Sequence, residues 1–540
     1  MDAVDEVNPD KQSRFNDLLK NKRIWLGLLF TGILMRFIAM FSSGIGLDAN
    51  IHATYATMWI ETGEGAFNWG ALRNLEQPMA NNPDTIVEPI GMNFIVWHCW
   101  IAIWFWLFGR SYFTLHLASF FLSCLVLTSV WAITKKVFDK DSALKMTAII
   151  SISPGLIQAS GKFYQEEALL LIVGAIAAVI VLGVQQNKEG KNPTWWFAGV
   201  PITLIFALTK GVQIYLAFSP LIIYLVFIAL RKKNSIAFLV KNQKISILLS
   251  LIIGLSIVPT IHIILGAETM KYALSHPSKF ILAFVIALFC MFIWIGIGMI
   301  VWPFISNWVK RIQQNSLDDS SVLLSMIVMF GFGAIWIYIA ALWTYEAHLA
   351  EMSILEISWE LRNNGRHAML LFIPFHYSLL AIHKNEKTKL ITNLNHIEKK
   401  STAFVLSVFI ITPFIIYAGM IGTDSSPEVT AKKLGELVIS NDEFLLITEP
   451  YIGSHQLYQF RLGVDPDYEK NIVGHWRTDQ SNWENEIQLE ERINHRGNLS
   501  NVNFLVISPD AYFDMNKLPN DWKENITEHK INGYLIIQKG

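Results

Sequence analysis

The chain has 540 residues, of which 52% are hydrophobic and only 16% are charged. Soluble domains are about 45–50% apolar and about 25% charged, so this composition excludes an ordinary soluble protein and predicts an integral membrane protein. The formal net charge of −1 hides a segregation, because most basic residues stand in short segments between long apolar runs. No basic groove pattern or nucleic-acid-binding module is present, so nucleic acid is not an expected partner.

The apolar runs predict a polytopic α-helical membrane protein with about eleven transmembrane helices, since roughly 20 apolar residues cross a bilayer. The first run follows Lys22 and Arg23 and lacks a small-residue cleavage pattern, which predicts a retained helix rather than a signal peptide. The predicted spans are residues 24–41, 113–134, 146–159, 168–184, 195–209, 212–230, 245–265, 280–302, 322–343, 368–382 and 403–420.

One further run, residues 92–108, is rich in Trp and decides the topology. If it lies along the membrane surface, nearly all clusters of Lys and Arg fall on one face, which the positive-inside rule makes cytoplasmic. If it crosses the bilayer, this asymmetry is largely lost. We therefore expect an interfacial helix, a cytoplasmic N-terminus, a multi-pass transmembrane domain over residues 1–420 and a long first external segment over residues 42–112.

The composition becomes polar after residue 420, and this region is expected outside the cytoplasm. Short apolar runs at residues 443–448, 502–507 and 534–537 predict strands, and residues 428–439 and 483–494 have helical spacing. Residues 421–540 are thus predicted to form a soluble extracytoplasmic α/β domain. This domain either contributes to acceptor binding or packs against the membrane domain as a cap.

The first external segment is long and polar, and it carries His52, Tyr55 and Glu88. Asp48 follows the first span by only a few residues, so it is held near the membrane surface. A carboxylate there can deprotonate the hydroxyl group of an acceptor.

The second external loop carries adjacent carboxylates, Glu166 and Glu167, directly before a span. Neighbouring residues of a helix point about 100° apart, so at most one of the two is expected to face a common site. The alternative is that both only complement the dipole at the start of a helix.

Two basic residues, Lys210 and Arg366, stand at the external ends of short spans, where an unpaired cation is costly. A lipid phosphate is a natural partner, since Arg binds phosphate bidentately and Lys binds it as a point charge. The alternative is that both side chains snorkel to the headgroup region.

Several short sequence fragments follow one another along the chain in an order that is typical of one superfamily. They are Asp48 with Tyr55 and Glu61-Thr62-Gly63, Glu88-Pro89 with the aromatic run that follows, Glu166-Glu167, Leu208-Thr209-Lys210-Gly211, and Arg366-His367 followed by Pro374. This ordered set resembles the GT-C glycosyltransferases that use polyprenyl-phosphate sugars, above all the dolichyl-phosphate-mannose protein mannosyltransferases and aminoarabinose transferases.

The resemblance implies a GT-C-like fold and an inverting transferase, with Asp48 as catalytic base and Glu166 or Glu167 as its acidic neighbour. It places the donor phosphate at Lys210 and Arg366, with His367, Glu88, Tyr55 and His52 as further substrate-binding residues. Two departures are present: Glu-Glu stands where many relatives have Asp, and no basic residue separates Glu88 from Pro89.

No cofactor is required by this chemistry, which needs a base, an oriented acceptor and a stabilised phosphate leaving group. Some relatives bind a divalent metal, and Glu88, His262 and His348 are weak candidates for ligands.

The sequence therefore predicts a glycosyltransferase that moves a sugar from a dolichyl or undecaprenyl phosphate to an acceptor on the extracytoplasmic face. The acceptor is a protein, a lipid or a glycan, and the membrane is the cell membrane of a prokaryote or the endoplasmic reticulum of a eukaryote. A secondary transporter is the alternative, but no internal repeat is visible and the charges gather at one face. An oligosaccharyltransferase-like enzyme is disfavoured because the sequence has no Trp-Trp-Asp motif. A non-catalytic scaffold is disfavoured because it leaves the ordered fragments unexplained.

Overall fold

The structure is a computed structural model, and its description covers most of the chain. The described residues are 19, 21–62, 94–211, 217–232, 241–264, 268–314, 317–349, 352–384, 398–420, 424–448, 453–467, 469–470, 472–477, 488–489, 494–495, 502–511, 513–518, 522 and 525–540.

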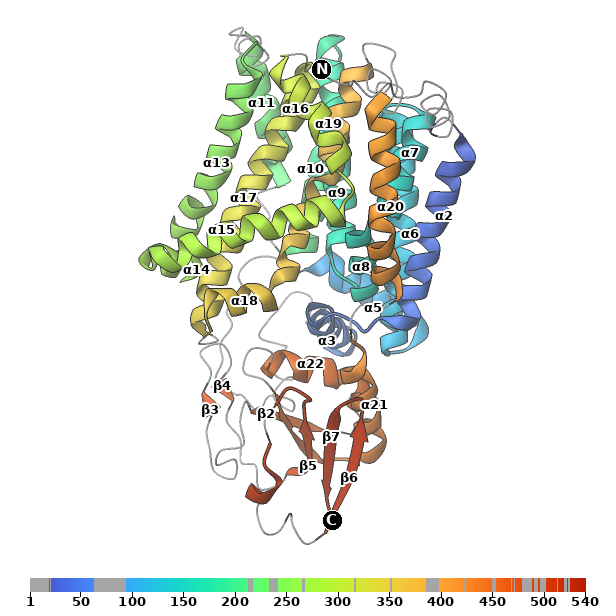
Figure 1. The fold of residues 1–540 in the computed structure, drawn as a ribbon, viewed down its shortest axis with the longest axis vertical. Helices are drawn as coiled ribbons and strands as arrows, with labels where there is room; N and C mark the ends of the chain where they lie inside the picture. The colour runs from blue at the N-terminus through green and yellow to red at the C-terminus, as the bar shows by residue number, and fades with distance from the viewer. Residues whose placement is uncertain are drawn as a thin grey trace, which may run out of the picture.

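The larger part of the molecule is a bundle of helices, drawn in the upper half of Figure 1. Its helices are α2 (Lys22–Ser42), α3 (Leu47–Thr62), α5 (Ile95–Phe108), α6 (Tyr112–Val137), α7 (Lys140–Ser151), α8 (Pro154–Lys162), α9 (Glu166–Lys188), α10 (Thr194–Lys210), α11 (Ser219–Lys232), α13 (Gln243–Ile264), α14 (Glu268–Ser275), α15 (Pro277–Ile293), α16 (Trp302–Gln313), α17 (Asp319–Leu349), α18 (Ile354–Glu360), α19 (Phe372–Lys384) and α20 (Glu398–Met420). A π-helical turn η2 (Trp294–Gly298) follows α15, and a 3-10 helix η3 (Arg362–Leu371) precedes α19.

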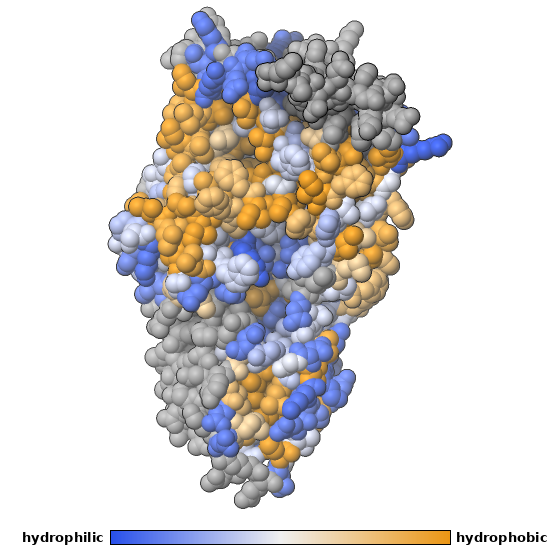
Figure 2. All heavy atoms as spheres, in the orientation of Figure 1, coloured by the Kyte–Doolittle hydropathy of each residue, from blue (hydrophilic) through white to orange (hydrophobic). Residues whose placement is uncertain are grey.

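The protein is mostly helical, and seven of the described helices are long and apolar enough to cross a membrane by length and composition. They coincide with seven of the eleven predicted spans. They are Lys22–Ser42, Tyr112–Val137, Glu166–Lys188, Gln243–Ile263, Pro277–Gly298, Asp319–His348 and Ala403–Met420. Their lipid-facing character is visible in Figure 2, where hydrophobic surface covers much of the upper half of the molecule. These features support an integral membrane protein.

The other four predicted spans are shorter or interrupted helices, so the count of eleven is not confirmed. Residues 146–159 are split between α7 and α8, because Pro154 cannot donate a backbone hydrogen bond and instead opens α8 at its first position. Residues 195–209 form α10, which has 17 residues. Residues 212–230 are described from α11 onward, and residues 368–382 are divided between η3 and α19.

The Trp-rich run forms α5, which has 14 residues. At 1.5 Å per residue it is about 21 Å long, shorter than the roughly 30 Å hydrocarbon core of a bilayer. Trp97 and Phe105 are buried against the bundle, whereas Trp106 and Phe108 are exposed. The length of α5 agrees with an interfacial helix better than with a span.

The C-terminal part contains a five-stranded mixed sheet, which lies at the opposite end of the molecule from the start of α2 (Figure 1). The strand order is β2-β1-β5-β7-β6, with β1 parallel to β2 and β5, and β7 antiparallel to β5 and β6. The strands are β1 (Glu443–Ile447), β2 (Val473–Arg477), β5 (Val502–Ile507), β6 (Ile526–Ile531) and β7 (Tyr534–Lys539), with a short 3-10 turn η6 (Met515–Lys517).

Helices α21 (Ser426–Leu437) and α22 (Gly453–Val464) pack on one face of this sheet around Phe444 and Phe460. A second apolar cluster with Leu505 and Trp522 lies on the other face. The three predicted strands are confirmed as β1, β5 and β7, and the helix predicted at residues 428–439 is confirmed as α21. The helix predicted at residues 483–494 is wrong where that segment is described, because β3 (Gln488–Leu489) and β4 (Asn494–His495) pair there as a two-stranded ribbon.

Helix α3 lies between the bundle and α22 (Figure 1). The chain leaves α2 at Ser42, runs through an extended link and enters α3 at Leu47. The backbone N–H of Gly46 in this link donates to the carbonyl oxygen of Lys162, 3.0 Å away. The start of α3 is thereby fixed to the turn between α8 and α9.

Candidate active site

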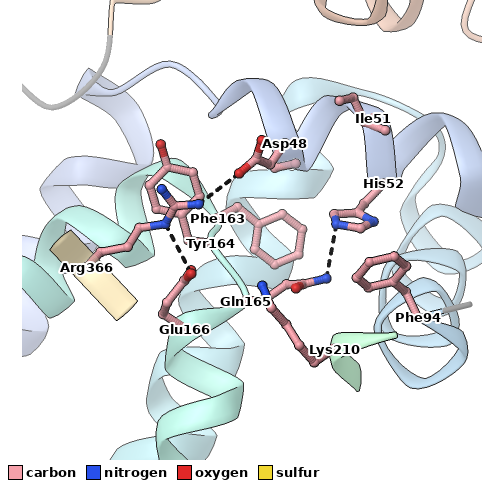
Figure 3. A pocket seen from close by; sticks show the side chains of 11 residues that line it. Asp48, Ile51, His52, Phe94, Phe163, Tyr164, Gln165, Glu166, Lys210 and Arg366 are labelled. Atoms are coloured by element: carbon pink, nitrogen blue, oxygen red, sulfur yellow. Dashed lines mark hydrogen bonds and ion pairs between the residues drawn. The ribbon is translucent and has the colours of Figure 1, made fainter. Parts of the chain in front are cut away.

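Four separate elements of the bundle bring charged side chains into one pocket of about 210 Å³. Asp48 comes from the first turn of α3, Glu166 from the first turn of α9, Lys210 from the last turn of α10, and Arg366 from η3. Figure 3 shows Arg366 between Glu166 and Asp48, with His52, Phe94 and Lys210 across the pocket. The full lining is Asp48, Ala49, Ile51, His52, Phe94, Phe163, Tyr164, Gln165, Glu166, Lys210 and Arg366.

Arg366 is the centre of the charge cluster. Its Nη2 lies 2.9 Å from Oδ2 of Asp48, and its Nε lies 3.1 Å from Oε1 of Glu166. Its guanidinium carbon stands 4.2 Å from the centre of the Tyr164 ring. Burial opposes the charge of Arg366, but Glu166, Tyr164 and Asp48 outweigh it and raise the pKa of the guanidinium. Arg366 is therefore a fixed cation between two carboxylates.

The two carboxylates of this cluster differ in access. The side chain of Glu166 is 2% exposed, whereas that of Asp48 is 57% exposed. His367 adds a contact to Glu166, with 3.0 Å between Nδ1 and Oε1. Burial lowers the pKa of His367, so the neutral ring donates its Nδ1 proton to Glu166. Glu166 is thus buried against Arg366 and His367, and Asp48 is the carboxylate that a substrate can reach.

Glu167 does not line the pocket. It faces Arg36 of α2, with 3.4 Å between Nε and Oε1, and its other oxygen accepts a hydrogen bond from the hydroxyl group of Ser123. Arg36 also donates to the backbone carbonyls of Gly32 and Ser151. Both charged side chains are at most 3% exposed. As expected for adjacent helical residues, only one of the two glutamates faces the pocket, and it is Glu166.

His52 lies in a chain of neutral hydrogen bonds at the other side of the pocket. Its Nε2 is 3.0 Å from Nε2 of Gln165, and its Nδ1 is 3.0 Å from Nε2 of His98 in α5. Burial, and then the charge of Lys210, lowers the pKa of His52 to about 3. The amide of Gln165 therefore donates to His52, and His52 donates to His98. Tyr55, one turn further along α3, stacks near His98 with 5.3 Å between ring centres.

Gln165 and His98 are site residues that the sequence reasoning missed. His98 is the one histidine in the apolar α5, and a buried imidazole normally needs a partner, which is a signal that could have marked it. Gln165 directly precedes the two glutamates, and nothing in its spacing distinguishes it from a solvated loop residue.

Lys162 is a third residue beside the site that the sequence analysis did not predict. It is 9% exposed and stands above the ring of Tyr164, on which Arg366 also packs. Burial, followed by the charges of Arg366 and Arg362, lowers the pKa of Lys162 to about 8. Lys162 therefore adds a third basic group near Asp48, beside the lining residues Lys210 and Arg366.

Lys210 ends α10, and Gly211 closes the helix with a φ of 70°. A Cβ atom at Gly211 would crowd the ring of Phe94, so the turn needs glycine for both its conformation and its close packing. The ion pairs found among the described residues do not include Lys210. It is a pocket-lining cation available to an anionic ligand.

The two candidate metal ligands that the structure describes, His262 and His348, have different neighbours. Glu88 lies outside the described residues. His262 of α13 faces Tyr338, with 6.2 Å between ring centres, whereas His348 of α17 stacks on Tyr272 at 4.4 Å. Neither histidine lines the pocket. Within the described part of the chain, no group of three or more His, Cys, Asp or Glu could hold a metal ion.

A second, larger cavity of about 550 Å³ lies near η3. Its walls are mostly apolar and come from α8, α15, η2, α18 and α20, with Phe289, Trp294 and Phe414 among them. Arg362 and Asn363 stand in its lining, and Arg366, one turn further along η3, belongs to the charged pocket. An apolar cavity and a charged pocket thus meet at one 3-10 helix.

Residues 95–264 match the family model described as dolichyl-phosphate-mannose-protein mannosyltransferase. The match confirms the resemblance to the GT-C glycosyltransferases that use polyprenyl-phosphate sugars, and it indicates a glycosyltransferase. It includes α5, α9 and Lys210, and ends before η3. No curated protein matches the sequence.

The chain also matches solved structures at about a tenth of residues identical. ArnT from Cupriavidus metallidurans in the apo state has 11% identity and a TM-score of 0.43, covering 95% of this chain and 97% of its own. ArnT bound to undecaprenyl phosphate has 10% identity and a TM-score of 0.42, covering 95% and 98%. The archaeal oligosaccharyltransferase AglB from Archaeoglobus fulgidus, in complex with an inhibitory peptide and a dolichol-phosphate, has 11% identity and a TM-score of 0.44, covering 91% and 70%. These identities and TM-scores are too low to assign a function to this chain.

Proposed function

We propose that the protein is an inverting glycosyltransferase that moves a sugar from a polyprenyl phosphate to an acceptor hydroxyl or amine on the extracytoplasmic face of the membrane. The observation that carries the proposal is the pocket in which the exposed carboxylate of Asp48 stands beside Arg366 and Lys210. One pocket then offers a base and two cations for a phosphate. The family match over residues 95–264 supports the same class of reaction.

In this reaction Asp48 takes the proton of the acceptor while the acceptor atom forms a bond to the anomeric carbon of the sugar. The bond from that carbon to the phosphate oxygen breaks, and its electron pair leaves with the lipid phosphate. Direct displacement inverts the anomeric centre and needs no covalent glycosyl-enzyme. General-base catalysis of this kind contributes about 10²–10⁴-fold to a rate.

The cations have separate tasks. Arg366 is held by Glu166 from behind, so its guanidinium is fixed in direction before a substrate arrives. Lys210 has no ion pair within the described residues and offers a point charge to the phosphate that leaves. Gln165 presents the remaining polar atoms of its amide to sugar hydroxyls, and His52, whose two ring nitrogens contact Gln165 and His98, orients that amide. Metal ions have no step in this mechanism.

The apolar cavity beside η3 is the proposed place for the polyprenyl chain. Exposed Leu355 and Trp359 of α18 stand in its lining, where a helix at the membrane surface would meet lipid. The polar groups of Arg362 and Asn363 stand in the same lining. A chain in this cavity places its phosphate near η3 and its sugar toward Asp48.

The extracytoplasmic orientation is proposed from charge. The C-terminal sheet lies at the end of the bundle where α2 ends and α9 begins, which is the end that carries the pocket (Figure 1). The clusters of Lys and Arg in the sequence fall at the other ends of these helices, so the positive-inside rule makes the pocket side external.

The test is turnover by purified protein with a panel of polyprenyl-phosphate sugars, comparing the wild type with Asp48→Asn. We expect product from at least one donor and a loss of about 10³-fold in Asp48→Asn, because the amide cannot accept a proton. Asp510→Asn, at an exposed aspartate of the C-terminal part, is the matched control and keeps wild-type turnover.

Donor binding, measured by thermal stabilisation, separates lost chemistry from lost affinity in Asp48→Asn. Equal turnover by the wild type and Asp48→Asn contradicts the role of Asp48. A wild type that neither binds nor turns over any donor contradicts the proposed function as a whole and favours a transporter.

A further inference from the structure

Glu428 of the C-terminal part reaches into the membrane bundle at the start of α3. It lies in the first turn of α21, it is 7% exposed, and its carboxylate accepts a hydrogen bond from the backbone N–H of Ile45. Ile45 is itself buried and stands three residues before Asp48. A carboxylate from the sheet domain is thus attached to the backbone that leads into the helix of the candidate base.

The link before α3 is held from two sides. On one side Ile45 donates to Glu428, and on the other the N–H of Gly46 donates to the carbonyl of Lys162. Gly44 packs so closely on the backbone of Asp424 that a Cβ atom there would collide with its carbonyl oxygen. Two successive backbone N–H groups with different partners leave the link little freedom to rotate, and Asp48 follows it directly.

Further contacts seat the same face of the C-terminal part on the bundle. The hydroxyl group of Tyr112 in α6 donates to the carbonyl of Gln459 in α22. Arg110 lies 3.6 Å from Asp467, and Lys432 stands 5.5 Å from the ring centre of Tyr112. These contacts hold the two parts together, but Glu428 contacts the link to α3 itself.

We propose that Glu428 is a positioning residue that sets Asp48 at its working distance from Arg366, so that the C-terminal domain takes part in catalysis through this one hydrogen bond. The proposal rests on the proposed function for its activity readout. A misplacement of about 1 Å at a reacting group can cost about 10²-fold in rate. Losing the acceptor for Ile45 is expected to cause such a shift.

The charge state of Glu428 gives a readout that plain packing does not. Burial raises its pKa from 4.5 to about 7, against the opposing effects of the Ile45 hydrogen bond and Lys432. The other ionisable groups around it are Asp424 on its own segment and Tyr112 and His116 on α6. A carboxyl group whose pKa is raised by docking favours docking at low pH, and this contribution is lost as the pH rises from about 4.5 to about 7.

The experiment compares Glu428→Leu and Glu428→Gln in the full-length protein. Glu428→Leu removes the acceptor, and we expect kcat to fall by about 10²-fold with the donor KM nearly unchanged. Glu428→Gln keeps an oxygen that accepts from Ile45 and never ionises. It should keep kcat near that of the wild type at pH 6, and it should lack the fall in activity that we expect for the wild type as the pH rises through about 7.

Glu436→Gln is the matched control, since Glu436 lies on the same helix but is exposed and pairs only with Lys433 among its described neighbours. Hydrogen exchange of the backbone at residues 43–50 gives a readout that needs no substrate. We expect faster exchange in Glu428→Leu, and wild-type exchange in the Gln variant and the control.

The proposal is overturned if Glu428→Leu keeps wild-type exchange at residues 43–50, or if Glu428→Gln loses as much activity as Glu428→Leu. If Glu428→Leu does not fold, the pH profile and exchange of Glu428→Gln decide alone, and an unchanged alkaline fall overturns the proposal. If the wild type turns over no donor, the proposed function fails, and the exchange comparison still decides the role of Glu428.

Discussion

Two buried arginines of the bundle have similar partners and opposite surroundings. Arg366 pairs with Glu166 and Asp48 beside a pocket, whereas Arg36 pairs with Glu167 and backbone carbonyls in a closed environment. The two glutamates are neighbours in the sequence, so one turn of α9 serves both clusters. Only the Arg366 cluster ends in an exposed carboxylate, that of Asp48.

The difference teaches that buried charge is not by itself a sign of function. The Arg36 cluster is as buried and as well hydrogen-bonded as the Arg366 cluster, and its carboxylate also accepts a hydrogen bond from Ser123. Neither Arg36 nor Glu167 lines the charged pocket or the apolar cavity, and the guanidinium of Arg36 donates to backbone oxygens of α2 and α7. What distinguishes the Arg366 cluster is access for a ligand and a second cation in the same pocket, Lys210, which has no ion pair among the described residues.

The largest expected contrast is between Arg366→Gln and Arg36→Gln. Arg366→Gln removes the cation that faces the pocket, and we expect about a 10²–10³-fold loss of kcat, the usual cost of removing one group that stabilises developing charge. Arg36→Gln should lower the thermal unfolding temperature because Glu167 is left buried without its cation. Its kcat, measured per folded molecule, should stay close to that of the wild type.

Turnover is to be normalised to the folded fraction, obtained from size-exclusion chromatography and thermal unfolding of the same samples. Comparable losses of kcat in both variants would break the distinction between the two clusters. Arg311→Gln, at a basic residue in the last turn of α16, is a control for charge removal outside both clusters.

A smaller effect sharpens the description of the closed cluster. Replacing Arg36 by Met or Glu167 by Leu leaves one buried charge unpaired, whereas the double replacement leaves none. We therefore expect the double variant to lose less unfolding free energy than the two single variants lose together. The difference, the coupling free energy, should be about 0.5–3 kcal/mol. Thermal and denaturant unfolding in detergent measure it. Strictly additive losses would show that the two side chains do not act as a pair.

Much of the candidate site was accessible from the sequence because its residues stand at the ends of recognisable apolar runs. Asp48, Glu166, Lys210 and Arg366 line one pocket, as the placement of their spans on one face suggested. The choice between Glu166 and Glu167 was not accessible. It depends on the rotation of α9 about its axis, which is fixed by packing against α10, α6 and α19 and has no local sequence signal.

Other features needed three-dimensional proximity that no spacing encodes. Glu428 stands 383 residues from Ile45 along the chain, so its contact with the link before α3 could not be inferred from either segment. The single span predicted at residues 146–159 is wrong, because the prediction followed the hydrophobic pattern and overlooked Pro154, which begins a new helix. Lys162 was not predicted near the site, because its burial arises from packing beside Tyr164 and Arg366, which the sequence does not reveal.

The smallest expected effect concerns the neutral side of the pocket and its link to Lys210. His52 has its pKa lowered to about 3 by burial first and by Lys210 second, so the ring is uncharged in the folded protein at neutral pH. A histidine with a lowered folded pKa gives stability that is present above about 6.5 and is lost as the pH falls toward 3. Lys210→Gln removes the second cause, so the pKa of His52 should rise while burial keeps it below 6.5. The thermal unfolding temperature should then fall less between pH 7 and pH 5 than in Lys271→Gln, a variant at an exposed lysine of α14.

Because a hydrogen bond to a charged group contributes about 1.5–3 kcal/mol, the donor KM of Lys210→Gln should also rise about tenfold or more. An acid slope equal in both variants would show that Lys210 does not act on His52 across the pocket, and an unchanged donor KM would separate Lys210 from the phosphate.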